Sequence, residues 1–305
     1  MMRQEDLRFR LDFTVEDDSI LLRDFLQQKG ISKKTLTATK YDGGALLVNG
    51  EEQTVRYRLG KGDTVSVLFP IEEPSAGLSP EEGELSVVYE DQALLILDKP
   101  AGMATIPSRD QPNGTVANLV AGKFRREQVP STVHVVTRLD RDTSGLICIA
   151  KNRHIHHLLS SQMEAVGFHR QYIAFVEGHL KESQFIIERP IGRKEGSIIE
   201  RTVRGDGQYA RTDVEVLGLY EREGTCFSEV MLVLHTGRTH QIRVHMQSLG
   251  HPLVGDDLYG GSLSLISRQA LHCASIGFCH PLTGVPLCFN SNLPPDLSML
   301  AIQTE

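Results

Sequence analysis

Residues 136–146 read Val136-Thr137-Arg138-Leu139-Asp140-Arg141-Asp142-Thr143-Ser144-Gly145-Leu146, and this stretch decides how the rest of the chain is interpreted. Taken without its surroundings, Asp140 in an Asp-Arg-Asp run is typical of a turn or a cap, and residues 143–145 predict a turn. The apolar residues 146–150 that follow predict a strand. The stretch therefore predicts a polar loop that leads directly into a strand.

The sequence around this loop predicts an α+β domain. Strand-like runs lie at residues 93–97, 146–150, 172–176 and 231–234, and helical segments are expected near 153–166 and 240–249. These strands and helices alternate irregularly, whereas a parallel βαβ sheet requires a regular alternation. We therefore expect one α+β domain over residues 84–305.

A smaller unit precedes this domain. Ser19 is a candidate cap for a first helix that Gly30 ends, and Ser32 is a candidate cap for a second, shorter helix. The Asn49-Gly50 pair favours a turn after an apolar strand, and the alternating residues 64–67 supply a returning strand. Together they predict a compact α+β module, which we place within residues 1–70.

An acidic segment separates the two units. Residues 71–83 combine glutamates with Pro74, Gly77 and Pro80, a composition that resists both helix formation and sheet pairing. We therefore expect a module at residues 1–70, a linker at 71–83 and a domain at 84–305.

The composition indicates a globular protein that binds nucleic acid, if at all, through a local patch. The chain has 305 residues, 40% of them hydrophobic, and a net charge of −7, which opposes RNA binding by overall attraction. Charges near the N-terminus argue against a signal peptide, and no apolar run is long enough to cross a bilayer. We expect a cytoplasmic protein with no membrane partner.

Cysteine and histidine patterns argue against a metal site. Five cysteines without a Cys-x-x-Cys pair indicate neither a disulfide framework nor structural zinc. Of the twelve histidines, the cluster of His154, His156 and His157 matches no familiar ligand spacing.

The module at residues 1–70 resembles the S4 RNA-binding domain. The resemblance rests on Ile31-Ser32-Lys33-Lys34, on residues 44–50 and on Gly62-Asp63. It implies that Ser32, Lys33 and Lys34, at the start of a short helix, contact RNA phosphates, which the helix amides also favour. Lys33 stands where the family often has arginine, so it would bind phosphate as a point charge.

The larger domain resembles the RluA/RluD family of pseudouridine synthases. The resemblance rests on residues 136–146, 97–102, 171–178 and 236–243, on residues 250–256 with Tyr259-Gly260, and on Leu271-His272-Cys273 with His280-Pro281. It implies an RNA-modifying isomerase whose mixed, largely antiparallel sheet contains a central catalytic cleft. Thr137 stands where many relatives have histidine, and Cys273 where they often have alanine.

The implied reaction needs no metal and no cofactor. Uridine becomes pseudouridine when the bond from ribose C1′ to uracil N1 breaks, the base rotates, and C1′ rejoins the base at C5. The resemblance assigns the required carboxylate to Asp140, which would attack C1′ or abstract a proton to give a glycal. Both routes stay open, and we favour elimination.

Further site residues follow from the same resemblance. A buried carboxylate needs a cation to stay ionised, and Arg238 is the candidate, with Thr239 capping the helix behind it. Arg243, in that helix, would contact RNA or support the pocket.

The target base must leave the RNA stack to be reached. We expect Arg138 to brace the flipped nucleotide and Tyr172 to stack on uracil and handle the C5 proton. Thr137 adjoins the chemistry and would affect base flipping or the choice of target.

The sequence thus predicts a cytoplasmic, monomeric isomerase acting on RNA, and family analogy favours 23S large-subunit ribosomal RNA. A transfer RNA target is the nearest alternative. A non-catalytic RNA-binding assembly factor is disfavoured by the intact Asp140, Tyr172 and Arg238 set. A carboxylate-dependent hydrolase would need a second, suitably placed carboxylate, for which only Asp142 is an obvious neighbour.

Overall fold

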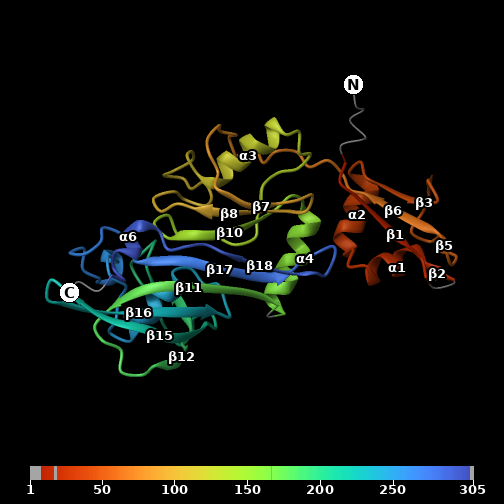
Figure 1. Cartoon of the computed structure of the whole chain (residues 1–305). Helices are drawn as coiled ribbons and strands as arrows, with labels where there is room; N and C mark the ends of the chain where they lie inside the picture. Colours follow the sequence, from red (N-terminus) through yellow and green to blue (C-terminus); the bar gives the residue numbers. More distant parts are fainter. Residues whose placement is uncertain (1–7, 17–18, 166, 303–305) are drawn as a thin grey trace.

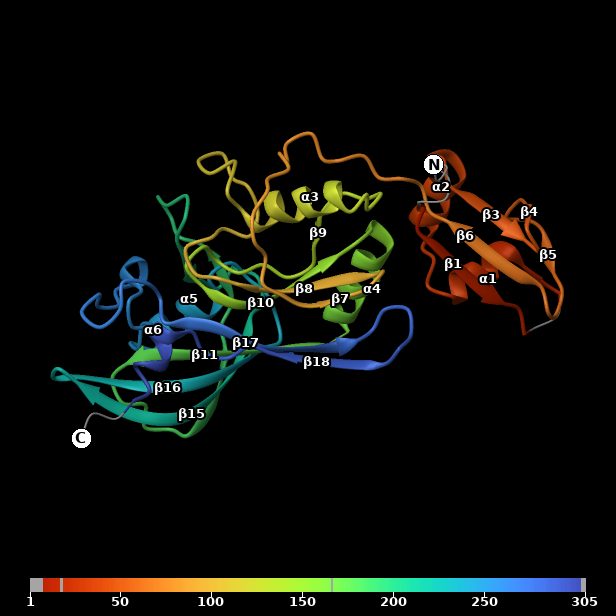
Figure 2. The ribbon, with the colours of Figure 1, turned by 45° about the horizontal axis from the view of Figure 1, so that its top comes forward.

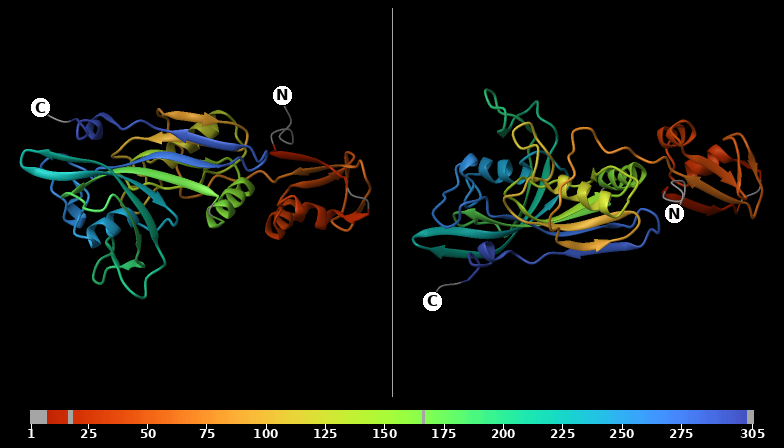
Figure 3. Two further views of the ribbon diagram at one scale, coloured as in Figure 1. Left: turned by 60° about the horizontal axis from the view of Figure 1, so that its bottom comes forward. Right: turned by 90° about the horizontal axis from the view of Figure 1, so that it is seen from above.

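We describe the protein from a computed structural model that covers residues 8–16, 19–165 and 167–302. A small N-terminal lobe lies beside a larger body, and Figures 1 and 3 show the two from several sides. The stretch at residues 1–7, which carries most of the charges that argued against a signal peptide, lies outside the described residues. None of the described helices is long and apolar enough to cross a membrane.

The N-terminal lobe has its own sheet and its own core. Its four-stranded sheet has the order β1 (Arg10–Thr14), β6 (Thr64–Leu68), β3 (Ala45–Val48) and β4 (Glu51–Glu52), and β2 (Ile20–Leu21) pairs separately with β5 (Arg58–Leu59). Helices α1 (Leu22–Gln28) and α2 (Lys33–Tyr41) complete the lobe. Apolar side chains such as Leu26, Val48 and Val65 form a core that is separate from the core of the body.

Two of the cap and turn predictions for this lobe are confirmed, and one is wrong. Ser32 caps α2, because its hydroxyl accepts a hydrogen bond from the Thr35 amide, and Asn49 and Gly50 both adopt positive φ in the turn between β3 and β4. The Ser19 prediction is wrong: Leu21 is the N-cap of α1, without a side-chain bond. The pairing of β2 with β5 extends the chain up to the helix, so Ser19 lies too early to cap it.

The body contains a ten-stranded sheet that is antiparallel at every pairing but one. Its main order is β12, β15, β16, β11, β17, β10, β8, β7, with β18 on β17 and β9 on β10. The bounds are β7 (Val87–Glu90), β8 (Leu94–Lys99), β9 (His134–Val135), β10 (Ser144–Ala150), β11 (Phe168–Glu177), β12 (Gln184–Glu188), β15 (Arg211–Arg222), β16 (Thr225–Leu234), β17 (Leu271–Cys279) and β18 (Pro286–Asn290). The predicted α+β class with a mixed, largely antiparallel sheet is confirmed.

The single parallel pairing joins the two halves of the sheet. Strands β10 and β17 pair over two positions, Ser144 with His272 and Gly145 with Cys273. Gly145 has a φ of +109°, and a Cβ there would lie 2.3 Å from the Cys273 carbonyl oxygen. Only glycine allows so close an approach, which explains its place in the 136–146 stretch.

The body also contains helices and short elements outside the main sheet. They are α3 (Val116–Arg126), α4 (Arg153–Glu164), α5 (Gln241–Ser248) and α6 (Pro295–Ser298), with the β13–β14 pair (Ile191–Arg193, Arg201–Val203) and η2 (Asp257–Tyr259). The expected helices near 153–166 and 240–249 correspond to α4 and α5, although residue 166 lies outside the described residues. The Thr239 cap is wrong, because His240, in the left-handed conformation, is the N-cap of α5.

Residues 71–83 form neither helix nor strand, yet they rest on the body (Figure 2). Glu72 contacts His134 and accepts a hydrogen bond from the Arg153 amide at 2.8 Å. Farther along, the Glu81 carbonyl lies so close to Gly122 of α3 that a Cβ there would be 1.8 Å from it. The segment is therefore a docked connection from the lobe to the body.

Candidate active site

A pocket of about 780 Å³ opens where the two halves of the sheet meet. Its walls come from residues 104–106, 135–141 and 143 on one side and 234–243 on the other, with Arg170, Tyr172 and Leu271 between them. A cavity of this size is typical of a small-ligand site. The 136–146 stretch thus supplies one wall and the start of α5 the other.

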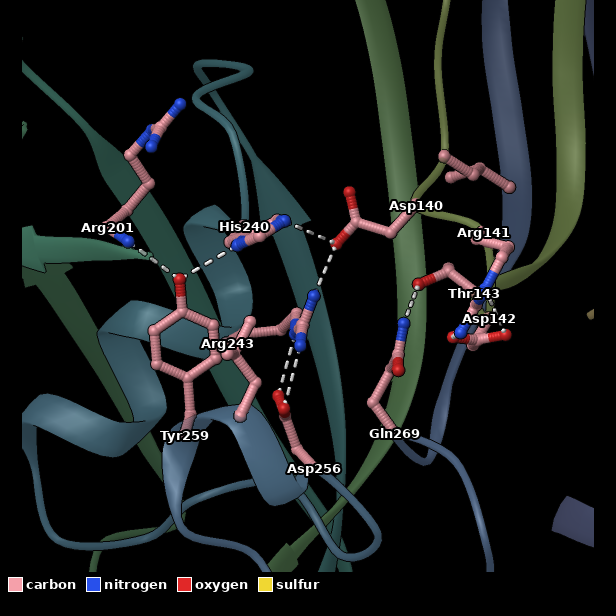
Figure 4. Close-up of polar contacts among 12 residues, drawn as sticks. Asp140, Arg141, Asp142, Thr143, Arg201, His240, Arg243, Asp256, Tyr259 and Gln269 are labelled. Carbon is pink, nitrogen blue, oxygen red and sulfur yellow. Dashed lines mark hydrogen bonds and ion pairs between the residues drawn. The ribbon is translucent and has the colours of Figure 1, made fainter. Parts of the chain in front are cut away.

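Asp140 is connected to a buried chain of charges (Figure 4). Its Oδ2 accepts a hydrogen bond from Arg243 Nη1 at 3.0 Å. The same guanidinium donates to both oxygens of Asp256, at 2.7 and 2.8 Å. The Asp256 side chain is fully buried, whereas 30% of the Asp140 side chain is exposed. Asp256 therefore orients Arg243 from behind, and Asp140 presents its carboxylate to the pocket.

Arg243 is buried but fully compensated. Burial disfavours its charged form, yet the hydrogen bonds and charges of Asp256 and Asp140 outweigh that effect and raise its pKa. The Tyr259 ring lies 4.9 Å from the centre of the guanidinium, which adds a cation–π contact. Three neighbours thus fix a cation beside Asp140.

The arginine that contacts Asp140 is therefore Arg243, and the expectation that Arg238 fills this role is not met. Arg238 lines the pocket, but its Nε donates to the Tyr209 carbonyl at 2.9 Å. The reason lies in the start of α5. Since the helix begins after His240, Arg243 is on its first turn and points inward, while Arg238 lies in the preceding loop.

His240 also faces Asp140. Its Nε2 lies 3.7 Å from Asp140 Oδ2, and its Nδ1 hydrogen-bonds the Tyr259 hydroxyl at 2.8 Å. That hydroxyl already accepts a hydrogen bond from the Arg201 amide at 2.9 Å, so its single proton is free for Nδ1. Burial lowers the pKa of His240 despite the charge of Asp140, which favours the neutral imidazole beside the carboxylate.

Tyr172 lies on β11 at the base of the pocket. Only 5% of the residue is exposed, and burial raises the pKa of its hydroxyl well above the ordinary value. Tyr172 is therefore a neutral phenol, which offers a ring face and a hydroxyl but not a phenolate.

Thr137 and Arg138 lie on the same wall but differ in access. Thr137 is buried, and its hydroxyl accepts a hydrogen bond from the Cys148 amide at 2.9 Å, which fixes the loop to β10. Arg138 is exposed at the pocket edge. Of the two, only Arg138 has a polar group free to reach into RNA.

The residues on either side of Asp140 are immobilised by hydrogen bonds. Thr105 Oγ1 donates to the Leu139 carbonyl at 2.7 Å. Lys99 Nζ donates to the Arg141 carbonyl at 3.0 Å and to the carbonyls of Pro100 and Met103, each at 2.8 Å. Lys99 is 1% exposed, and burial lowers its pKa to about 8. One buried ammonium thus ties two loops together next to Asp140.

Sequence reasoning brought Asp140, Tyr172, Arg138, Thr137, Arg238 and Arg243 to one pocket, and the structure places all six on its walls. The sequence predicted that Ser32, Lys33 and Lys34 lie in the N-terminal module instead. In the structure Ser32 caps α2 of the N-terminal lobe, and the two lysines begin that helix. Sequence reasoning gave no role to Lys99, His240 or Asp256. Each lies in a segment quoted above, but its immediate neighbours along the chain carry no signal that marks it. Within residues 8–16, 19–165 and 167–302, no group of three or more His, Cys, Asp or Glu could hold a metal.

We predict that Lys99→Met lowers the free energy of unfolding by at least about 2 kcal/mol, because three carbonyls lose their donor. The unfolded chain keeps the Lys99 proton up to its ordinary pKa of 10.5, whereas the folded chain loses it near 8. Wild-type stability relative to Lys99→Met therefore rises between about pH 8 and 10.5. Urea unfolding at a series of pH values measures both effects.

The exposed Lys181→Met is the control and should unfold as wild type does. A stability gap between wild type and Lys99→Met that shrinks above pH 8 would contradict the buried-ammonium assignment.

Comparisons with known proteins identify relatives of this chain. Residues 93–248 match the RNA pseudouridylate synthase family. The uncharacterized RNA pseudouridine synthase YjbO of Bacillus subtilis is 45% identical over 283 residues, which span 92% of this chain and 97% of that protein. Ribosomal large subunit pseudouridine synthase D of Xanthomonas campestris pv. campestris is 35% identical over 271 residues, 84% of this chain and 80% of that protein.

A solved structure extends the likeness to three dimensions. Human RNA Pseudouridylate Synthase Domain Containing 1 aligns with a TM-score of 0.57 and 27% identity, over 74% of this chain and 89% of that one. The family match covers more than half of the chain, and it includes the 136–146 stretch and the start of α5. The chain belongs to the RNA pseudouridine synthase family, the isomerases that convert uridine to pseudouridine.

Proposed function

We propose that Asp140 is the catalytic carboxylate and that the substrate is a uridine of large-subunit ribosomal RNA. The observation that carries the first part is the position of Asp140, which faces the pocket and is paired with a buried, doubly anchored arginine. The second part is supported by relatives named as ribosomal large subunit pseudouridine synthases, which cover most of this chain.

Four pocket residues have roles in this proposal. Asp140 acts at the ribose, either by attack on C1′ or by proton abstraction, and Arg243 orients its carboxylate through their hydrogen bond. Tyr172 packs against uracil and, as a neutral phenol, exchanges hydrogen bonds rather than acting as an anionic base. Arg138 braces the flipped nucleotide at the pocket edge.

The N-terminal lobe supplies a second RNA contact in this proposal. The exposed Lys33 and Lys34 begin α2 next to its cap Ser32, so two cations and free helix amides lie on one small surface. This arrangement supports an S4-like module at residues 1–70, a linker at 71–83 and a catalytic domain at 84–305. We propose further that the protein is a cytoplasmic monomer.

The first test replaces Asp140 with asparagine. Asp140→Asn should reduce pseudouridine formation below detection, since it removes the charge and the nucleophile, while RNA affinity changes less than about threefold. Asp142→Asn, which alters a neighbouring carboxylate outside the proposed chemistry, is the matched control. Pseudouridines are mapped across total RNA from cells that lack the protein and carry wild type or a variant.

Positions restored by wild type and Asp142→Asn, but not by Asp140→Asn, identify the substrate. Sites found in transfer RNA rather than ribosomal RNA would refute the proposed target while leaving the enzyme assignment intact. Turnover by Asp140→Asn would refute the mechanism.

A second test compares the two arginines of the pocket. Arg243→Lys should lower the single-turnover rate about 100-fold, because an ammonium cannot bridge Asp256 and Asp140 as the planar guanidinium does. Arg238→Lys, whose side chain bonds a carbonyl, should lower it less than tenfold. The reverse order of the two variants would restore Arg238 as the partner of Asp140.

A third test concerns the N-terminal lobe. Lys33→Ala/Lys34→Ala should weaken RNA binding and reduce the slope of log Kd against log salt by about 2, one unit for each lost phosphate contact. The rate at saturating RNA should stay within about twofold of wild type. Lys181→Ala, an exposed lysine outside the lobe, controls for net charge, and an equal slope change in that variant would argue against a phosphate site on α2.

A further inference from the structure

Arg170 is a buried cation of the pocket that the mechanism above does not use. It lies on β11, two residues before Tyr172, and 8% of it is exposed. Its Nε is buried without a hydrogen-bond partner, and among residues 8–16, 19–165 and 167–302 no carboxylate forms an ion pair with it. The guanidinium nevertheless lines the pocket.

An unpaired buried guanidinium is costly and unusual. Nearly all buried polar groups in folded proteins have partners, and buried charges are normally paired. Arg243, at the other side of the same pocket, illustrates the normal case, because two carboxylates accept its hydrogen bonds. Arg170 lacks such compensation within the described chain, which indicates that its partner arrives with the substrate.

The surroundings leave space for this guanidinium. A Cβ on Gly237 would lie 2.9 Å from Arg170 Nη1, so the glycine of the loop before α5 accommodates the side chain. Residues 170 and 172 alternate with exposed neighbours on β11, so Arg170 and Tyr172 point to the same face of the sheet. Two residues along a strand advance about 7 Å. A base against Tyr172 can therefore reach the guanidinium with an exocyclic oxygen.

We propose that Arg170 binds a carbonyl oxygen of the flipped uracil and stabilises the negative charge that this base acquires during the reaction. When the C1′–N1 bond breaks, its electron pair stays on uracil and spreads from N1 to O2 and O4. Formation of the C1′–C5 bond consumes that charge, C5 loses its proton and N1 gains one, so the isomerisation balances without a further reactant. A guanidinium beside such an oxygen favours the charged state more than the starting uridine.

An RNA phosphate could also accept hydrogen bonds from this guanidinium, but it is the less suitable partner. Phosphates remain charged and hydrated throughout, whereas Arg170 is almost fully buried beside the residue that packs against the base. A phosphate oxygen and a uracil oxygen would affect different measured quantities. A phosphate contact strengthens binding, and a contact with the departing uracil accelerates the reaction.

The test uses the full-length enzyme and an RNA oligonucleotide that spans the uridine mapped with the variants above. Arg170→Met keeps the length of the side chain and removes the charge. It should lower the single-turnover rate at saturating RNA about 100-fold or more, while Kd and its salt dependence change less than about twofold. Arg170→Lys should recover part of the rate. Because an uncompensated buried charge is removed, the Tm of Arg170→Met should equal or exceed that of wild type.

Thio-substituted RNA identifies the oxygen. Replacement of O2 or O4 of the target uridine by sulfur weakens a hydrogen-bond acceptor, so one of the two should slow wild type and have little effect on Arg170→Met. An unchanged rate, a lower Tm, or a loss confined to Kd with a reduced salt slope would each overturn the proposal, the last in favour of a phosphate.

The inference rests on the proposed active site at Asp140, and Asp140→Asn is measured in parallel. An inactive Asp140→Asn with a fully active Arg170→Met would refute this inference alone. Activity in Asp140→Asn would instead refute the site.

Discussion

The body depends on a parallel contact that is only two residue pairs long. Strands β10 and β17 join the two halves of the sheet there, and Gly145 allows their backbones to approach within a distance that any side chain would prevent. Ser144 and His272 strengthen the contact with a hydrogen bond of 3.0 Å between their side chains. Because the two halves meet at this point, the loop before β10 and the helix after β16 face each other across one pocket.

The two buried arginines of that pocket, Arg243 and Arg170, differ in how their charge is compensated. Asp256 and Asp140 neutralise Arg243, so this part of the pocket is stable before RNA arrives. No carboxylate among residues 8–16, 19–165 and 167–302 pairs with Arg170, so this side of the pocket carries a positive charge that the described chain does not compensate. A substrate that develops negative charge would compensate for it only during the reaction, which is the condition for electrostatic catalysis.

The sequence was informative wherever a residue's neighbours along the chain determine its behaviour. Ser32 caps α2 because the amide it needs is three residues away, and Asn49-Gly50 turns because both residues tolerate positive φ. The choice between Arg238 and Arg243 was of another kind. It depended on where α5 begins and on the buried Asp256, which lies 13 residues beyond Arg243 and contacts it only in the folded chain.

The sequence by itself determined the family and the α+β class and directed attention to Asp140, because the residues of the 136–146 stretch and their spacing carry that information without coordinates. Tertiary structure alone decided which cation contacts Asp140, how Lys99 holds the loops around it, and that the buried Nε of Arg170 has no hydrogen-bond partner among the described residues. The physical reason is that burial and pairing are properties of segments brought together from distant parts of the chain, and the free energy of a charge depends on both.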